Sequence, residues 1–367
     1  MSPLKIICVA GARPNFMKIA PLMEAFAAET AFTPLLVHTG QHYDEKMSDL
    51  FFRQLGIPQP DVNLGIGSGS HALQTAEVMK AFEPICLNEK PHVVLVVGDV
   101  NSTIACGLVA VKLGIQLVHV EAGLRSGDRA MPEEINRILT DSISDLLFCT
   151  EPAGVENLKR EGAADEKIHL VGNVMIDTLL KNQAKAEQST ILDDLNLTPR
   201  KYAALTLHRP SNVDDPVVFG RILDALETIQ QDLPLIFPIH PRTRKNLPSL
   251  GLQHRVDAMA NLRLLDPIGY LDFLKLTSNA RIVLTDSGGI QEETTITQVP
   301  CLTLRENTER PITAEIGSNQ IVGTQTADIL AAYRRVIDGQ FRSPRIPDLW
   351  DGHAAQRIAK ILLEHHP

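Results

Sequence analysis

Three acidic residues in the first half of the chain follow apolar segments, where a parallel sheet gathers the side chains that contact a ligand. Asp99 follows the apolar run 92–97, and Glu121 follows the run 115–120 and directly precedes Ala-Gly. Glu133 lies further along the same loop, behind a proline. Carboxylates that converge on one substrate can act as general acids and bases, so these three are candidates for proton transfer.

Each of the three acids also has a structural interpretation. Asp99 is well placed to cap the helix expected after it. Glu121 can be held in an ion pair by Arg125, and Glu133 can be a first-turn acid that the dipole of its helix favours. Both interpretations stand until the contacts of each acid are known.

The segment 286–293, DSGGIQEE, gives the strongest single signal in the chain. A predicted strand ends in Asp-Ser, and two glycines then open a helix, so backbone N–H groups can approach an anion closely. An acid further into the helix can accept hydrogen bonds from ribose hydroxyls, and an arginine follows the next predicted strand. The pattern predicts a nucleoside diphosphate site, formed by Ser287, Gly288, Gly289, Glu293 and Arg310.

Other cationic and imidazole side chains also follow predicted strands. Arg13 and Lys18 lie at the start of a helix after the first strand, which is typical of an anion site. In the second half, His208 and Arg209 follow one strand and His240 follows another. A single histidine there is more often structural, but two in one sheet favour a functional role. The His, Cys and acidic residues lack the spacing of a metal site, so no metal is expected.

The composition is that of a globular protein with no nucleic-acid footprint. The chain has 367 residues, 44% of them hydrophobic, and a net charge of −9. Phosphate-backbone binding favours a basic surface, so we expect no nucleic-acid partner. The apolar run at the N-terminus is too short for a membrane span or a signal-peptide core. The five cysteines are scattered through apolar segments, which favours reduced core thiols and a cytoplasmic location.

Short apolar runs alternate with helical periodicity, and the pattern occurs twice. Continuous apolar strands indicate parallel sheets covered on both faces. The sequence therefore predicts an α/β fold with two Rossmann-like doubly wound domains that face each other across a cleft, at 1–172 and 173–345, and a C-terminal helix in 346–367 that packs back across the domains. The strands are predicted in 5–11, 32–40, 92–100, 115–123, 145–150, 202–208, 233–240, 262–267, 280–287 and 299–306, and the segment 167–173 is expected to lead out of the first domain.

The second half thus offers a diphosphate site and the first half offers carboxylates, a division that suits a sugar nucleotide. With these residues in order, the chain resembles the non-hydrolysing UDP-N-acetylglucosamine 2-epimerases, which have the GT-B fold. The resemblance spans nearly the whole chain, in the motifs GARPNFMKIAPL, TGQHYD, VVGDVNST, HVEAGLRSGD, PEEINR, LHRPSN, DSGGIQEE and TERP.

The resemblance implies reversible interconversion of UDP-GlcNAc and UDP-ManNAc. UDP is eliminated to give 2-acetamidoglucal and then adds back after C2 is reprotonated on the opposite face. This chemistry needs no nicotinamide and no metal. A homodimer through the N-terminal domain is also implied, as is a role in polysaccharide biosynthesis.

Matching motifs assign roles to individual residues. Asp99, Glu121 and Glu133 resemble the family's acid/base carboxylates, and His208 resembles the residue that assists departure of the diphosphate. The predicted UDP-binding residues are Arg13, Lys18, Ser287, Gly288, Gly289, Glu293 and Arg310. The segment 266–273 resembles the uracil-contacting loop, with Phe273 against the base and Ile268 limited to a backbone contact. Gln41, His42, Arg209 and His240 match positions linked to a second, activating UDP-GlcNAc.

Several departures keep alternatives open. Asn15 stands where many members have Glu, and Ile312 stands where Glu is usual. Some relatives hydrolyse the glycal and others act on UDP-2,3-diacetamido-glucuronate, so both activities are alternatives. In the helix 74–82, Phe82 replaces an expected Arg, which weighs against activation by a second substrate. A GT-B glycosyltransferase is a more distant alternative, because it does not explain three acids around one sugar.

Overall fold

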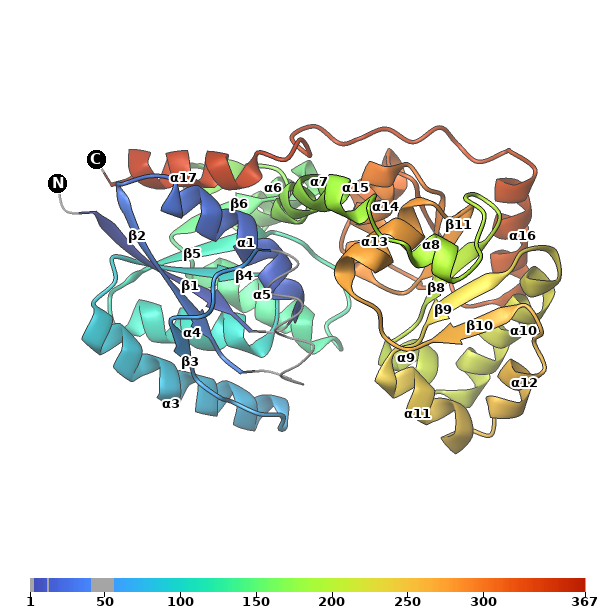
Figure 1. The fold of residues 1–367 in the computed structure, drawn as a ribbon. Helices are drawn as coiled ribbons and strands as arrows, with labels where there is room; N and C mark the ends of the chain where they lie inside the picture. The colour runs from blue at the N-terminus through green and yellow to red at the C-terminus, as the bar shows by residue number, and fades with distance from the viewer. Residues whose placement is uncertain (1–2, 12, 41–55, 367) are drawn as a thin grey trace. The chain divides into compact units, whose positions relative to one another are not determined.

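The computed structural model describes residues 3–11, 13–40 and 56–366, and these fold into two compact units. Unit 1 contains residues 1–181 and 348–367, and unit 2 contains residues 182–347. Each unit is built around one parallel sheet with helices on both faces (Figure 1). The predicted α/β fold with two parallel sheets is confirmed.

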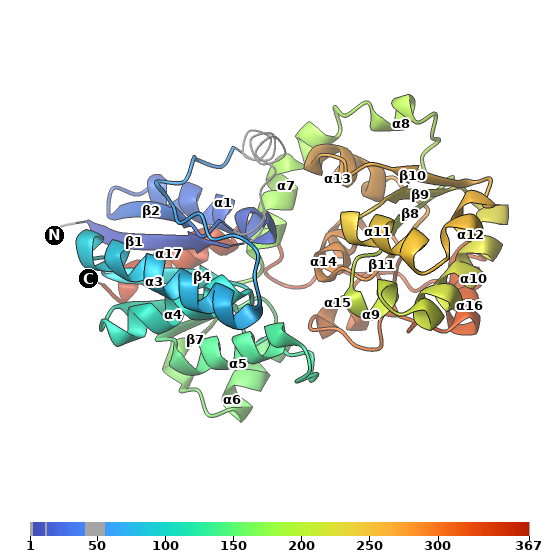
Figure 2. The same cartoon turned by 90° about the horizontal axis from the view of Figure 1, so that it is seen from below.

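The sheet of unit 1 has seven strands in the order β3-β2-β1-β4-β5-β6-β7. The strands are β1 (Leu4–Ala10), β2 (Phe32–His38), β3 (Val62–Asn63), β4 (Val93–Val97), β5 (Gln116–Ala122), β6 (Leu146–Cys149) and β7 (Ile168–Leu170). The helices are α1 (Arg13–Ala27), α3 (His71–Glu89), α4 (Asn101–Lys112), α5 (Pro132–Ile143), α6 (Pro152–Arg160), α7 (Val174–Ala186) and α17 (Ala354–Glu364). Helices α3 and α4 lie on one face of this sheet and α1 and α17 on the other (Figures 1 and 2).

The sheet of unit 2 has six strands in the order β10-β9-β8-β11-β12-β13. The strands are β8 (Ala203–Thr206), β9 (Leu235–Pro238), β10 (Leu262–Leu265), β11 (Ile282–Thr285), β12 (Cys301–Thr303) and β13 (Asn319–Ile321). The helices are α8 (Ile191–Asp194), α9 (Pro210–Val213), α10 (Pro216–Asp232), α11 (Pro241–Ser249), α12 (Gln253–Asp257), α13 (Tyr270–Ser278), α14 (Gly288–Thr297), α15 (Pro311–Glu315) and α16 (Thr326–Ile337).

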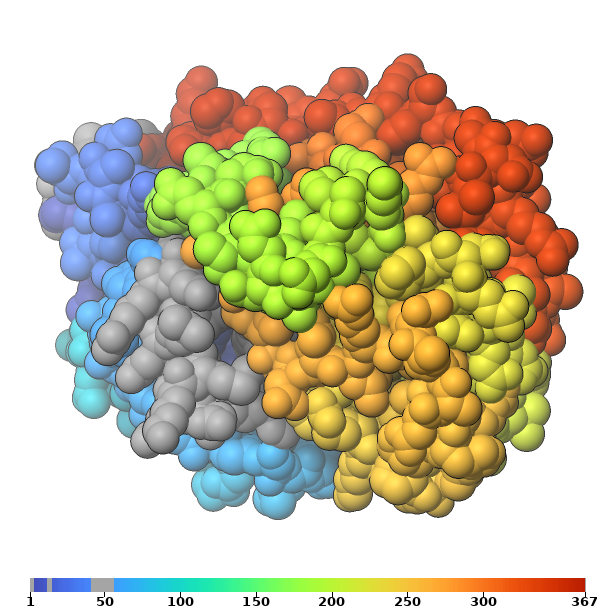
Figure 3. Space-filling view, turned by 45° about the vertical axis from the view of Figure 1, so that its right-hand side comes forward, coloured from blue at the N-terminus to red at the C-terminus, as the bar shows by residue number. Residues whose placement is uncertain are grey.

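Side chains on alternate positions of the central strands fill cores on both faces of the unit 2 sheet. Ala203 and Leu205 of β8 pack with α10 and α16, whereas Ala204 packs with α8, α13 and α14. Figure 3 shows the light green surface of α8 beside the orange surface of α13. Just before α8, Ser189 Oγ donates to Asp272 Oδ1 of α13 at 2.5 Å. Burial on both faces explains why these strands read as continuous apolar runs.

In both sheets the first three strands of the unit are added in one direction, and the fourth strand then pairs with the other side of the first. In unit 1 the reversal lies between β1 and β4, and in unit 2 it lies between β8 and β11. The loops at the carboxyl ends of such neighbouring strands diverge to opposite faces and leave a crevice for a ligand. The topology therefore predicts that the loops after these four strands contact a ligand.

The predicted strands are present, and the structure adds three short strands at sheet edges. β3 has two residues, and β7 and β13 have three each, too few to carry the apolar run on which the sequence prediction relied. All five cysteines are free and buried. None of the helices in the described part of the chain has the length and apolar character that a membrane crossing needs.

The division between the units differs from the predicted boundaries at 172 and 345. Most of α7 belongs to unit 1 because Thr178 Oγ1 donates to Met17 O at 2.5 Å and Asp177 caps α17 through the backbone N–H groups of Ala354 and Ala355. Burial raises the pKa of Asp177. Helix α17 likewise packs on α1 within unit 1.

Gly172 generates a stability prediction. It has a φ of 86°, and a Cβ there would lie 2.1 Å from the carbonyl oxygen of Leu349. Gly162 has a similar φ of 89° but no atom near its Cβ position, so it serves as a matched control. We expect Gly162→Ala to lower the free energy of unfolding by about 1 kcal/mol. Gly172→Ala should lower it by roughly 2 kcal/mol more, because it adds a backbone clash to the same dihedral strain.

Urea unfolding followed by the fluorescence of Trp350 measures both changes in unit 1. Trp350 is the single tryptophan, and its buried Nε1 donates to Thr150 O at 2.9 Å. Equal losses in the two variants would contradict the close approach at Gly172.

Candidate functional site

Glu121 ends β5 with a buried carboxylate in a left-handed turn. Its φ is 77°, which costs a residue with a side chain roughly 1–2 kcal/mol. The β5–β6 register shifts between Val120 and Ala122, where this turn lies. Glu121 Oε2 accepts a short hydrogen bond from Lys18 Nζ, and both side chains are buried. Lys18 therefore fixes this carboxylate while the Glu121 backbone is strained.

The ion-pair partner of Glu121 is Lys18 and not Arg125, which corrects the structural alternative from the sequence. Arg125 Nη2 instead lies 2.7 Å from Asp141 Oδ2 and 2.6 Å from Glu161 Oε2. Lys18 is a buried lysine of α1, between one and two turns after the helix begins at Arg13. The motif GARPNFMK identified Lys18 as a candidate cation, but nothing in the sequence indicated that its partner is Glu121.

Gly98 makes room for the Lys18–Glu121 pair. It follows β4 with a φ of 66°, and a Cβ there would lie 3.0 Å from Lys18 Nζ and 3.2 Å from Glu121 Oε2. Asn15 also approaches this point, and its Nδ2 donates to Val97 O at 3.2 Å. A residue without a side chain is thus needed where the ion pair meets the end of the strand.

Asp99 is held by an arginine and does not cap α4. Its Oδ2 lies 3.0 Å from Arg137 Nε and 2.9 Å from Arg137 Nη2. Asn136 Nδ2 donates to the carbonyl oxygen of Asp99 at 2.9 Å. The N-cap of α4 is Val100, which makes no side-chain capping bond, so the capping interpretation was wrong. The Asp99 side chain keeps 30% of its surface exposed and can reach a ligand.

The two glutamates of PEEINR have different environments. Glu133 is half-buried in the first turn of α5. Glu134 is buried, accepts from the backbone N–H groups of Ser126 and Gly127 at 2.9 Å, and pairs with Arg137. Glu134 therefore has a structural role and holds the loop before α5.

His208 and Asp286 form a dyad at the point where the unit 2 sheet reverses. Asp286 follows β11, is fully buried, and lies 2.8 Å from His208 Nδ1. It also accepts from the backbone N–H groups of His208 at 2.9 Å and Arg209 at 2.8 Å. Burial raises the pKa of Asp286, but the hydrogen bonds and charge of His208 outweigh burial and lower it. With Nδ1 held, Nε2 is the ring nitrogen that can meet a ligand.

The start of α14 combines backbone N–H groups with a cation. A Cβ at Gly288 would lie 2.6 Å from Arg310 Nη1, so the glycine lets this guanidinium pack onto the helix terminus. Arg310 Nε donates to Glu292 Oε1 at 2.6 Å, and Arg310 Nη1 lies 3.6 Å from Glu309 Oε2. Ser287 precedes the helix and makes no capping bond with its side chain. A helix N-terminus beside a fixed cation suits a diphosphate.

Sequence reasoning missed the acids that fix this cation. Glu309 is buried, and Arg305 Nη2 donates to its Oε1 at 2.7 Å. Burial raises the pKa of Glu309, but Arg305, Arg310 and Arg209 outweigh burial and hold the pKa well below its usual value. Glu292 and Glu309 stood within the quoted motifs, but their burial and pairing depend on contacts between separate loops.

Glu293 is buried beside the phenol of Tyr270. Within the described part of the chain, Glu293 Oε2 and the Tyr270 hydroxyl have no hydrogen-bond partner. Burial, followed by the charge of Glu292, raises the pKa of Glu293 to about 8. Phe273 and Ile268 are half-buried and pack against the same core that holds Ile290 of α14. The predicted ribose and uracil residues thus share one side of the unit 2 sheet.

Two of the four residues predicted for an activator site, His240 and Arg209, lie in the described part of the chain. His240 caps α11 by accepting from the backbone N–H of Arg242 at 3.2 Å, and its ring centroid lies 5.7 Å from that of His208. Burial, then the charge of His208, lowers the pKa of His240. Arg209 lies beside Asp286, with Nε 3.4 Å from its carbonyl oxygen. Gln41 and His42, like the side chain of Arg13, lie outside the described residues, so the activator site stays a prediction.

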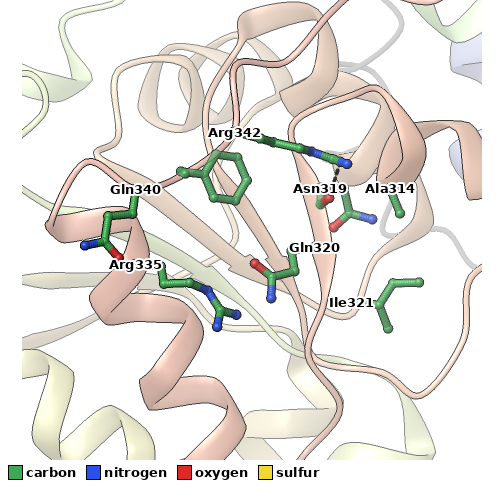
Figure 4. A pocket seen from close by; sticks show the side chains of 8 residues that line it. Ala314, Asn319, Gln320, Ile321, Arg335, Gln340 and Arg342 are labelled. Carbon is green, nitrogen blue, oxygen red and sulfur yellow. Dashed lines mark hydrogen bonds between the residues drawn. The ribbon is translucent and has the colours of Figure 1, made fainter.

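A separate cavity of about 270 Å³ in unit 2 lies against β13 and α16 (Figure 4). Arg342, which lines the cavity, donates to the carbonyl oxygens of Thr313, Glu315 and Asn319. The guanidinium is therefore used to hold backbone, and this cavity is not the candidate site. Among the described residues, no cluster of His, Cys, Asp or Glu is arranged to hold a metal ion.

Comparison with known proteins agrees with this arrangement. The family model for UDP-N-acetylglucosamine 2-epimerase matches residues 24–363. A UDP-N-acetylglucosamine 2-epimerase from Methanococcus maripaludis is 43% identical, with 98% of each chain covered. A UDP-2,3-diacetamido-2,3-dideoxy-D-glucuronate 2-epimerase from Pseudomonas aeruginosa is 41% identical, with 98% of this chain and 99% of that protein covered.

Similarity extends to solved structures. The crystal structure of the Methanocaldococcus jannaschii UDP-GlcNAc 2-epimerase, in complex with UDP-GlcNAc and UDP, superposes with a TM-score of 0.91. That chain is 41% identical, and the match covers 98% of this chain and 100% of that one. With a family model and close relatives that span nearly its whole length, the chain belongs to the UDP-N-acetylglucosamine 2-epimerase family.

Proposed function

We propose that this enzyme interconverts UDP-GlcNAc and UDP-ManNAc by eliminating UDP to a 2-acetamidoglucal and adding it back. The observation that carries the proposal is the buried Glu121 carboxylate, which Lys18 holds in a strained turn, with Asp99 just beyond the end of the neighbouring strand β4. A surface acid does not need such a position. A proton-transfer group does, because small displacements from the reacting atom are costly in rate.

Elimination solves a chemical problem at C2 of the sugar. The C2 hydrogen is not next to a carbonyl group, so its direct removal is prohibitive. Breaking the C1–O bond builds positive charge at C1 and acidifies the C2 hydrogen. One carboxylate then removes that proton, and a different acid returns a proton to the opposite face before UDP adds back. At least two acid/base groups are therefore required, which Asp99, Glu121 and Glu133 can supply.

Unit 2 is proposed to bind UDP and to stabilise it as a leaving group. The N–H groups of Gly288 and Gly289 and the Arg310 guanidinium would hold the diphosphate. His208, with Nδ1 held by Asp286, would present Nε2 to the diphosphate oxygen as negative charge develops. Glu293 would contact the ribose, and Phe273 with the backbone of Ile268 would contact uracil. The homodimer expected from the resemblance stays a prediction.

Incubation with UDP-GlcNAc in deuterated water tests the proposal. The wild-type enzyme should place deuterium at C2 of both epimers. Glu121→Gln should slow this exchange by roughly 10²–10⁴-fold, because general acid/base groups contribute about that much. The control is Glu166→Gln, an exposed acid of the same unit, which should leave exchange unchanged. Conversion without C2 exchange would contradict the proposal.

A related substrate is the second candidate function. The Pseudomonas relative that acts on a diacetamido-glucuronate is 41% identical, close to the 43% of the Methanococcus enzyme, so identity does not separate them. The same exchange assay, repeated with the uronate and with UDP-GlcNAc, decides between them. Exchange only with the uronate would favour this second candidate. Release of free ManNAc with UDP would favour a hydrolysing epimerase.

The pKa of about 8 at Glu293 gives UDP binding a pH dependence. Below that pH the carboxyl is neutral and can both donate to and accept from a ribose hydroxyl. Above it, the buried carboxylate repels the diphosphate anion and loses its donor. Titration calorimetry with UDP should therefore show an affinity that falls as pH rises through 8, by up to about tenfold at pH 9 relative to pH 7. In Glu293→Gln, which mimics the neutral form, affinity should stay flat over that range. Parallel profiles in the two proteins would rule out Glu293 as the titrating group.

A further inference from the structure

His119 lies at the centre of a buried hydrogen-bond network that the proposed reaction does not itself use. It precedes Glu121 by two residues on β5 and is fully buried. Its Nδ1 lies 2.6 Å from Asp141 Oδ1, and its Nε2 lies 2.8 Å from the carbonyl oxygen of Gly98. A carbonyl oxygen only accepts, so Nε2 donates to Gly98. The Asp141 carboxylate holds the other ring nitrogen, so both nitrogens of this buried ring have a partner.

Asp141 connects the same network to the turn after Glu121. Its Oδ2 accepts from the backbone N–H of Gly123 at 3.1 Å and lies 2.7 Å from Arg125 Nη2. Burial raises the pKa of Asp141, but the charges and hydrogen bonds of His119 and Arg125 outweigh burial and lower it. One carboxylate of α5 therefore binds both the turn after β5 and the imidazole that donates to Gly98, the residue after β4.

The two peptides held by this network adjoin two of the proposed acid/base residues, Asp99 and Glu121. The Gly98 carbonyl belongs to the peptide that leads into Asp99, and the Gly98 Cα faces the Lys18–Glu121 pair. Gly98, Glu121 and Gly123 all have left-handed backbones, with φ of 66°, 77° and 80°. The two glycines adopt this conformation without strain, whereas Glu121 keeps it only where surrounding contacts fix it. The His119–Asp141 pair supplies contacts at both turns.

We propose that His119 and Asp141 are positioning residues that set the placement of Asp99 relative to Glu121. This inference rests on the proposed function, because it assigns the pair a role in the rate of C2 proton transfer. Loss of either hydrogen bond would let the two turns relax independently, and an error of about 1 Å at a reacting group can cost roughly 10²-fold in rate. UDP binding, which the proposed function places in unit 2, would be unaffected.

Asp141→Asn tests the proposal against a matched control, Asp145→Asn. Asp145 Oδ2 accepts from the backbone N–H of Leu117 at 2.9 Å, so it binds the opposite end of the same strand. Asp141→Asn should lower kcat for C2 exchange by roughly 10²-fold. Its KM and its Kd for UDP should change by less than about twofold, since the diphosphate site is intact. Asp145→Asn should keep kcat within about twofold even where Trp350 fluorescence shows a comparable loss of stability.

Variants of His119 give a second test, which can be used even if Asp141→Asn does not fold. His119→Gln retains a donor near the Nε2 position for the Gly98 carbonyl, whereas His119→Phe retains none. Rates are divided by the concentration of protein that binds UDP, so that unfolded protein does not count. On that basis, kcat of His119→Gln should be at least about tenfold higher than kcat of His119→Phe, because the glutamine keeps the contact with the Gly98 carbonyl.

Three outcomes separate the claims. Absence of exchange in the wild-type protein would overturn the proposed function itself. Normal wild-type exchange with equal kcat in the Asp141→Asn and Asp145→Asn variants, or in the two His119 variants, would overturn the positioning role alone. A fall in kcat matched by an equal loss of UDP affinity would also overturn it, because that pattern indicates general structural damage.

Discussion

The burial of the Glu121 carboxylate beside the Lys18 ammonium is the constraint on which the rest of the site depends. Leaving one of two such charges unpaired costs about 3–5 kcal/mol, so the surrounding structure must keep both in register. The glycine at position 98 and the left-handed backbone of Glu121 follow from that requirement. A strand that ended in an ordinary turn would direct the carboxylate elsewhere.

The two units share a strand order but differ in the charge they place at the reversal of the sheet. In unit 1 the loops after β4 and β5 carry acids, each with a fixed cationic partner. In unit 2 the loops after β8 and β11 carry an imidazole and a glycine-rich helix start, and the loop after β12 adds an arginine held by buried glutamates. The same fold thus carries the proposed proton-transfer groups in one unit and the proposed diphosphate site in the other, which is the division that the proposed elimination of UDP requires.

Much of this arrangement could be predicted because it depends on local patterns. Apolar runs identified the central strands, and DSGGIQEE identified a helix start that suits an anion. The partners of the acids could not be predicted in the same way. Lys18 and Glu121, or His119 and Asp141, are far apart in sequence and meet only through strand order and a change of register.

Weak local signals account for the remaining differences. The edge strands β3 and β13 are too short to carry an apolar pattern. Asp99 was a reasonable cap by position, but its side chain pairs with Arg137 of α5, which offers two donors. Most of helix α7 belongs to unit 1 through a hydrogen bond and a helix cap that no sequence boundary marks.

Breakage of the C1–O bond is the central claim, and it can be followed with an oxygen label. UDP-GlcNAc that carries ¹⁸O only in the oxygen between C1 and the β-phosphorus is incubated with the enzyme, and recovered UDP-sugar is read by phosphorus NMR. If UDP leaves and returns, its β-phosphate rotates in the site, and the label appears in non-bridging positions at a rate comparable with epimerisation. Epimerisation with every label still in the bridge would show that the bond to C1 never breaks, and the account would be wrong.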